Sequence, residues 1–211
     1  METRYPTLHQ LRSSQSGVAI VEFALAIPLL VLLTFGGLEL ANLVLTHMRI
    51  SQIAITVADN AGRVRTGIDE SNIYEVFAGA ALIGQNIDFP NNGRVVLSSL
   101  EPNGQAGANA GQMINWQRCY GSLAVSPAYG RQGVGRTDAS LAAGLGPAGN
   151  KITSASGTAV MFVEVTYHYV PVFFTGISGI AGDIRYESAF NVRERTNQNI
   201  TNTQRLAVRS C

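Results

Sequence analysis

A single glutamate stands near the start of the long apolar run in this sequence. Residues 16 to 37 read SGVAIVEFALAIPLLVLLTFGG, and Glu22 is the only charged residue from Val18 to Leu38. A carboxylate at the centre of a bilayer-spanning helix is unfavourable by about 2.5–3.5 kcal/mol, so it usually marks a function or lies near the membrane surface. Two interpretations follow: Glu22 pairs with a positive charge, or it merely extends towards the lipid headgroups.

The residues in front of Glu22 indicate where a positive charge could arise. Gly17 is followed by Val18, three more apolar residues, and then Glu22 and Phe23. Hydrolysis of the bond after Gly17 would create an α-amino group that is largely protonated at neutral pH. Glycine also offers a protease a backbone without a side chain. Glu22 would lie about one helical turn, roughly 6 Å, from the new amine, and could pair with it or with that of a neighbouring subunit.

The order glycine, four residues, glutamate and aromatic resembles the processing site of type IV prepilins. It is most similar to the form in the Flp, TadE and TadF proteins of the tight-adherence (Tad) pilus. The phrase GVAIVEFALAIPLLVLLTFGGLEL resembles the TadE-like family further, with Pro28 inside the run and Glu39 at its end. The resemblance implies that a membrane prepilin peptidase cuts after Gly17 and removes residues 1 to 17 as a leader.

This resemblance implies a minor pilin or pseudopilin that takes part in assembly of a Tad (type IVc, Flp) pilus. The implied partners are the prepilin peptidase, other Tad pilus subunits and inner-membrane assembly proteins. The alternative is an uncleaved single-pass envelope protein that presents a binding domain outside the cytoplasm. N-terminal sequencing would separate the two, because the first predicts Val18 as the N-terminus and the second predicts Met1 or Glu2.

The apolar run is long enough to cross a membrane, which needs roughly 20 apolar residues, so membrane lipid is an expected partner. Arg4 and Arg12 precede it and favour an N-terminus in the cytoplasm and residues after about 45 outside it. The resemblance to Tad pilus proteins implies that the membrane is a bacterial inner membrane and that the C-terminal domain is periplasmic. The mature chain could also enter the pilus. A removable secretory signal is not expected, because the small residues 24 to 26 come too early in the run.

No motif in the sequence predicts catalysis. Residues 130 to 137, GRQGVGRT, have the spacing of a phosphate-binding loop, but Arg136 replaces its lysine and no clear strand precedes it. The three histidines and two cysteines lack the spacing of a metal site. We therefore expect no enzyme, no cofactor and no metal. A formal charge of +1 gives no basic field, so nucleic acid is not an expected partner.

Cys119 and Cys211 are the only cysteines. In an oxidising compartment they could form a disulfide that ties down the polar C-terminal tail. Closing a loop of roughly 90 residues would stabilise the domain by up to about 4–5 kcal/mol on the chain-entropy estimate. The alternative is a buried, inert Cys119 and a free surface thiol at Cys211, because the sequence does not show whether their Cα atoms approach within about 7 Å.

Beyond the apolar run, the hydrophobic pattern becomes one-sided. Apolar and polar residues each recur at spacings of three and four, which predicts an amphipathic continuation of the membrane helix to about Asn60, with Gly62 near its end. Residues 18 to 65 would thus form one helical unit. The apolar face comprises Leu43, His47, Ile50, Ala54, Val57, Ala61 and Val64, and the polar face comprises Asn42, Arg49, Gln52, Thr56, Asp59 and Arg63.

Residues 66 to 211 are predicted to form an extracytoplasmic α+β domain with a helix packed on an antiparallel sheet. The indicated elements are a helix over 71–84 and strands over 94–100, 112–119, 158–170 and 184–193. The third strand alternates, with Glu164, Thr166 and His168 on its polar face, as in a half-buried strand. Residues 101–157, rich in Gly, Ala and Ser, are predicted to be a long, partly mobile loop region.

One further apolar stretch, residues 169–182, is interrupted by Pro171 and by three glycines. It is interpreted as the end of a buried strand followed by a loop. A re-entrant membrane segment is the alternative.

Overall fold

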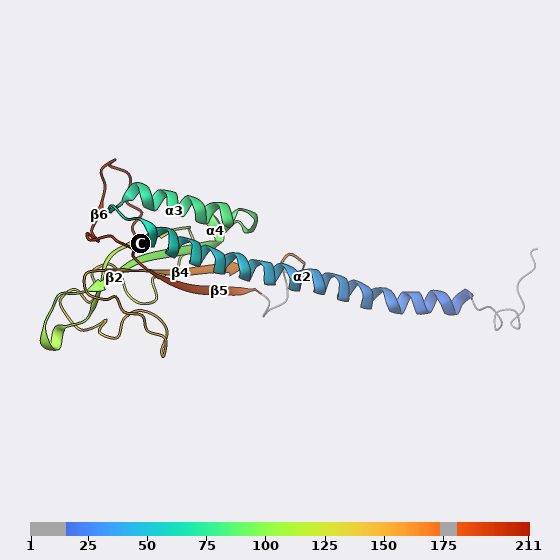
Figure 1. Cartoon of the computed structure of the whole chain (residues 1–211). Coiled ribbons are helices and arrows are strands. Elements are labelled where there is room, and N and C mark those ends of the chain that lie inside the picture. Colours follow the sequence, from blue (N-terminus) through green and yellow to red (C-terminus); the bar gives the residue numbers. More distant parts are fainter. Residues whose placement is uncertain (1–15, 174–180) are drawn as a thin grey trace, which may run out of the picture.

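The computed structural model describes residues 16–173 and 181–211, so most of the predicted leader lies outside the described residues. One helix of 48 residues, α2 (Ser16–Arg63), connects the apolar run to the domain. Its length is roughly 70 Å at 1.5 Å per residue. Figure 1 shows the first half of α2 projecting away from the molecule and its second half lying along the sheet.

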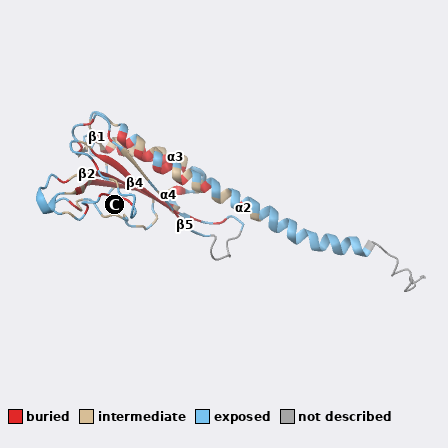
Figure 2. Cartoon of the chain, turned by 60° about the horizontal axis from the view of Figure 1, so that its bottom comes forward, coloured by how far each residue is buried: buried red, intermediate tan, exposed pale blue. Residues whose placement is uncertain are grey.

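The first half of α2 is exposed on all sides. Within Gly17–Arg63 the most apolar window has a mean hydropathy of 2.5, and none of it is buried. Figure 2 shows the change from an exposed to a buried helix along the chain. An apolar helix that the described residues leave uncovered needs lipid or neighbouring helices to cover it. The predicted long helix is confirmed, and it is apolar enough to cross a membrane.

The second half of α2 packs on the domain with the predicted apolar face. Its buried residues are Ile50, Ile53, Ala54, Val57, Ala58 and Ala61. The assignment of Asn42 to the solvent side is wrong, because its Nδ2 donates a hydrogen bond to the hydroxyl of Tyr169 (3.0 Å). Thr46 is also buried and donates to the carbonyl of Asn42 (2.8 Å). The helix therefore turns the polar side chains of Asn42 and Thr46 towards the domain, ahead of its first buried apolar residue, Ile50.

A second helix, α3 (Glu70–Ile83), packs beside α2. Its start is fixed by a capping box, in which the Asp69 carboxylate accepts from the Ser71 N–H (3.1 Å) and the Asn72 side chain accepts from the Asp69 N–H (3.0 Å). The predicted helix over 71–84 is thus confirmed within one residue at each end. Its buried face is formed by Ile73, Val76, Phe77 and Ala80.

The sheet has four antiparallel strands in the order β3-β2-β4-β5, which confirms the α+β prediction. The strands are β2 (Gly93–Pro102), β3 (Gln112–Tyr120), β4 (Val160–Tyr169) and β5 (Gly182–Asn191). The smaller elements are η1 (Gln85–Ile87), α4 (Phe89–Asn92), η2 (Gly107–Asn109) and a parallel pair formed by β1 (Ile68–Asp69) and β6 (Ile200–Thr201). Helix α2 lies on β4 and β5.

The sheet is covered on both faces, which differs from the predicted half-buried strand. Glu164 and Thr166 were assigned to a polar face, yet they are only 9% and 8% exposed. The loop after β3 returns over this face, and the Ala128 N–H donates to the Glu164 carboxylate (2.8 Å). Only His168 is exposed as predicted, with its Nδ1 2.9 Å from Asp183 Oδ1. The second core cluster comprises Leu100, Ile114, Leu141, Leu145, Val160 and Phe162.

A disulfide and hydrogen bonds hold the C-terminal tail against the edge strand β3. Cys119 and Cys211 form a disulfide with their Cα atoms 5.0 Å apart. The Cys119 N–H donates to the Arg209 carbonyl (2.8 Å), and the indole N–H of Trp116 donates to the Gln198 carbonyl (2.9 Å). Tail residues therefore cover an edge that would otherwise expose unpaired backbone groups.

Candidate functional site: helix α2 and its two glutamates

The predicted processing residues lie on the first turns of α2. Val18 is 58% exposed and Phe23 is 66% exposed, and Glu22 is exposed as well. Apart from its chain neighbours and the backbone of its own helix, no described atom lies within 4 Å of where a side chain on Gly17 would begin. The bond after Gly17 belongs to the helix's first turn, where helices fray readily, so local unwinding would expose it to a peptidase. The geometry permits access to this bond, and cleavage there stays a prediction.

Glu22 follows Val18 by four residues, so both side chains lie on the same face of α2. Within residues 16–173 and 181–211, no hydrogen bond or ion pair involves the Glu22 carboxylate. An amine created at Val18 would arise one turn away from this carboxylate. Glu22 is therefore placed to receive a positive charge that the described chain does not supply.

Glu39, at the other end of the apolar run, has the opposite environment. It is only 4% exposed. Its Oε2 accepts hydrogen bonds from the backbone N–H groups of Val172 (3.0 Å) and Phe173 (2.8 Å). The hydroxyl of Tyr169 also donates to it. This one side chain fixes the end of β4 and the residues after it against α2.

A short chain of hydrogen bonds leads from α2 through Tyr169 to Glu39. Asn42 donates to the Tyr169 hydroxyl, and that hydroxyl donates to the Glu39 carboxylate. Burial, together with the hydrogen bond to Glu39, raises the pKa of Tyr169 to about 12. Tyr169 thus remains a neutral donor at physiological pH. Sequence reasoning assigned Glu39 only a place in the family pattern, because its partners lie about 130 residues further along the chain.

Residues 170–173 depart from the predicted burial of this stretch. Tyr169 is buried, but Val170, Val172 and Phe173 are 52%, 60% and 43% exposed. The ring centroids of Phe173 and Phe35 are 5.0 Å apart. The remainder of the predicted loop, residues 174–180, lies outside the described residues. The described part places exposed apolar side chains beside the membrane half of α2.

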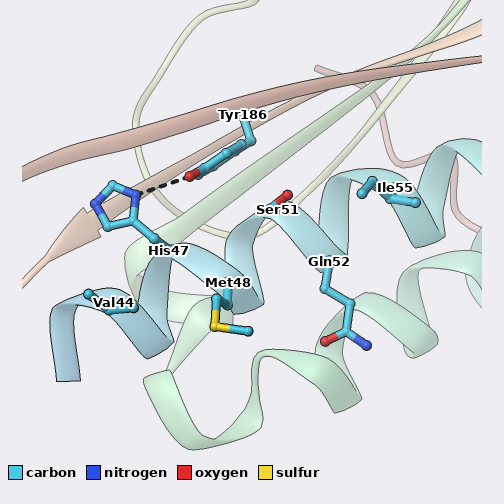
Figure 3. Close-up of a pocket in the computed structure, with 7 residues that line it drawn as sticks. All are labelled: Val44, His47, Met48, Ser51, Gln52, Ile55 and Tyr186. Carbon is cyan, nitrogen blue, oxygen red and sulfur yellow. Dashed lines mark hydrogen bonds between the residues drawn. The ribbon is translucent and has the colours of Figure 1, made fainter. Parts of the chain in front are cut away.

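An apolar groove of about 540 Å³ lies on the outer side of α2, between the helix and β5 (Figure 3). Met48 is 63% exposed, and Val44 and Ile55 are each 50% exposed. The imidazole of His47 lies 3.2 Å from the Tyr186 hydroxyl at the back of the groove. The groove is lined by Val44, His47, Met48, Ser51, Gln52, Ile55 and Tyr186.

Other candidate chemistry finds no support in the described residues. No group of three or more His, Cys, Asp or Glu side chains within residues 16–173 and 181–211 could hold a metal ion. In the stretch 130–137, the carbonyl groups of Gly130 and Gly135 accept from Gln117 and Asn103, so this loop is used to cover β3. It is not preceded by a strand that would aim it at a phosphate.

Comparison with known proteins supports the pattern at the head of α2. A family model described as TadE-like protein matches residues 17–59. The match covers the whole apolar run and most of the part of α2 that packs on the sheet. No curated protein and no solved structure matches the chain. Over residues 17–59, the chain is thus similar to TadE-like proteins.

Proposed function

We propose that this chain is a minor pilin or pseudopilin that takes part in assembly of a Tad (type IVc, Flp) pilus, after cleavage behind Gly17. The observation that carries the proposal is the Gly17 to Glu22 order at the head of an exposed apolar helix, inside the region of the family match. A peptidase needs an accessible bond, and assembly needs an uncovered helix. The first half of α2 offers both.

The proposed site works through electrostatics. Cleavage creates an ammonium group at Val18 within a low-dielectric environment, where an unpaired charge is costly. Glu22 compensates it, either within one chain or between two neighbouring subunits. An assembly that offers each amine a carboxylate is therefore favoured over one that leaves either unpaired. The role is structural and needs no catalytic residue in this chain.

The proposed arrangement places the N-terminus in the cytoplasm and residues 66–211 in the periplasm, with α2 in the inner membrane before assembly. The partners are the prepilin peptidase, other Tad pilus subunits and inner-membrane assembly proteins. The exposed groove of Figure 3 continues the apolar surface of α2 beyond the membrane. It supports a helix that contacts neighbouring subunits along much of its length.

The test is processing in a host that contains the prepilin peptidase. Wild-type protein should have Val18 as its N-terminus, and Gly17→Val should retain residues 1–17. The matched control is Gly37→Val, because Gly37 lies in the same helix with no atom within 4 Å of where its side chain would begin. The control should be processed as wild type. A wild-type N-terminus at Met1 or Glu2 would instead identify an uncleaved single-pass envelope protein.

A further inference from the structure

The segment after β4 presents an apolar tip beside the membrane half of α2. Val170, Val172 and Phe173 are exposed, although the chain places most large apolar side chains of its domain in the two core clusters. Phe173 and Phe35 lie in ring contact. Clustered exposed apolar side chains mark a surface that contacts something other than water.

The depth of this tip follows from the helix that it contacts. If Val18 lies at the inner edge of the hydrocarbon core, Phe35 lies about 26 Å further along the axis. A hydrocarbon core is about 30 Å thick, so Phe35 is still inside it, near its outer edge. Phe173 is then at the same depth. The apolar groove beneath it, lined by Pro28, Val31, Leu32 and Phe35, extends further into the membrane.

A non-helical segment can enter this region only if its backbone polar groups have partners. The Glu39 carboxylate supplies partners for two of these groups, because it accepts from the N–H groups of both Val172 and Phe173. The groups just above the tip are polar. His168 and Asp183 form an exposed pair at the adjoining ends of β4 and β5. An apolar tip below a polar pair is the arrangement expected at the headgroup boundary.

We infer that residues 170–173 form a second membrane contact, in which Val170, Val172 and Phe173 insert into the outer part of the bilayer beside α2. The occupant of this surface is lipid, because the tip adjoins the part of α2 that lies inside the hydrocarbon core. The contact fixes the height and rotation of the domain relative to the membrane. It goes beyond the proposed pilus function and concerns the chain while it resides in the membrane.

The test uses the full chain, one molecule per lipid nanodisc. A cysteine introduced as Val172→Cys is labelled with an environment-sensitive fluorophore without reductant, because Cys119 and Cys211 are already joined. The control is Ala108→Cys, in the exposed β2–β3 connection at the opposite end of the sheet. Leu38→Cys and Leu32→Cys, both on exposed positions of α2, calibrate depth.

The label at residue 172 should show blue-shifted emission and should lose most of its fluorescence when lipids carry a nitroxide near the headgroup. Its quenching should resemble that of the Leu38→Cys label, while the Ala108→Cys label stays unquenched. Emission and quenching equal to those of the Ala108→Cys label would overturn the inference. Blue-shifted emission without quenching by lipid nitroxides would also overturn it, because the tip would then be covered by protein.

Discussion

Glu22 and Glu39 bracket the same apolar run, yet their surroundings are opposite. Glu22 is exposed, and no partner for it occurs among the described residues. Glu39 is 4% exposed and receives hydrogen bonds from Tyr169, Val172 and Phe173. Both are carboxylates on one helix at the edge of a membrane-grade segment. The difference is that the folded chain already satisfies one of them and leaves the other for a partner.

This comparison shows that the two halves of α2 have different roles. The second half of the helix is part of the domain's core, and Glu39 marks the point where that packing begins. The most apolar window of the first half is not buried by any described residue, and its ring contact with the domain is that of Phe35 with Phe173. A substitution in the second half should therefore change the stability of the isolated chain. A substitution in the first half should change what the chain does with its surroundings.

The largest expected effect on stability is that of Glu39→Ala. The substitution removes the acceptor of the buried Tyr169 hydroxyl and of the partly buried N–H groups of Val172 and Phe173. A buried donor that loses its acceptor costs about 1–3 kcal/mol. We expect the free energy of unfolding to fall by about 2–5 kcal/mol. Fluorescence of Trp116, the only tryptophan, would follow the unfolding of the chain by denaturant in nanodiscs.

Two variants give this experiment its controls. Glu39→Gln keeps the shape and one acceptor oxygen, so its loss should be smaller than that of Glu39→Ala. Leu40→Ala changes an adjacent, 62% exposed residue and should leave the domain's unfolding close to wild type. An unfolding midpoint for Glu39→Ala equal to that of Leu40→Ala would show that the contacts of Glu39 contribute nothing to stability.

The comparison also shows what the sequence could predict. Local patterns sufficed for α2, for α3 and for the four strands, because periodicity and capping act over a few residues. They failed for Asn42, whose partner Tyr169 is 127 residues away. They failed again for Glu164 and Thr166, because a polar residue on an alternating strand indicates solvent unless another segment covers it. No local pattern predicted that the Gly-rich region would cover this face of the sheet.

For the candidate site, the residues could be predicted from the sequence, whereas their contacts are known only from the structure. The Gly17 to Phe23 order is a local motif, and the family match over residues 17–59 supports it. The partners of Glu39 could not be predicted, because they depend on how β4 meets α2. For Val172 and Phe173 the sequence favoured a buried strand end and loop over the membrane alternative, because an apolar run beside a strand is typical of a core, yet both residues are exposed.

A third carboxylate, Glu164, extends the comparison. It is buried like Glu39, but among the described residues no positively charged group lies as close to it as the hydrogen-bond donors lie to Glu39. Burial is the main cause that raises the pKa of Glu164 to about 7, and the negative charge of the cross-strand neighbour Glu187 adds to it. The hydrogen bond from Ala128 acts in the opposite direction. A raised carboxyl pKa means that the folded state holds a proton that the unfolded state releases above its ordinary pKa, which is near 4.5.

The contribution of Glu164 to the free energy of unfolding should therefore decrease as the pH rises from about 4.5 to about 7. Glu164→Gln removes this titration and keeps an acceptor for the Ala128 N–H. We expect it to be more stable than wild type by about 1–2 kcal/mol at pH near 8, with a flatter pH profile. Denaturant unfolding at several pH values measures both. Glu75→Gln, at an exposed glutamate of α3, is the control and should keep the wild-type profile; an unchanged profile in Glu164→Gln would refute the assignment.

The smallest expected effect on stability is that of Glu22→Ala, and the prediction is informative for that reason. The Glu22 carboxylate makes no hydrogen bond or ion pair with a described residue, so unfolding of the domain, followed by Trp116, should be the same as in wild type. Membrane insertion should not suffer, because the substitution removes an unfavourable charge from an apolar helix. Cleavage after Gly17 should also proceed.

Piliation, or surface adhesion, should decrease in Glu22→Ala, because the amine at Val18 would then lack its counter-charge during assembly. Electron microscopy of pili, together with N-terminal sequencing of the same variant, measures assembly and processing separately. Full piliation by a correctly processed Glu22→Ala protein would return Glu22 to the role of a carboxylate that only reaches the headgroups.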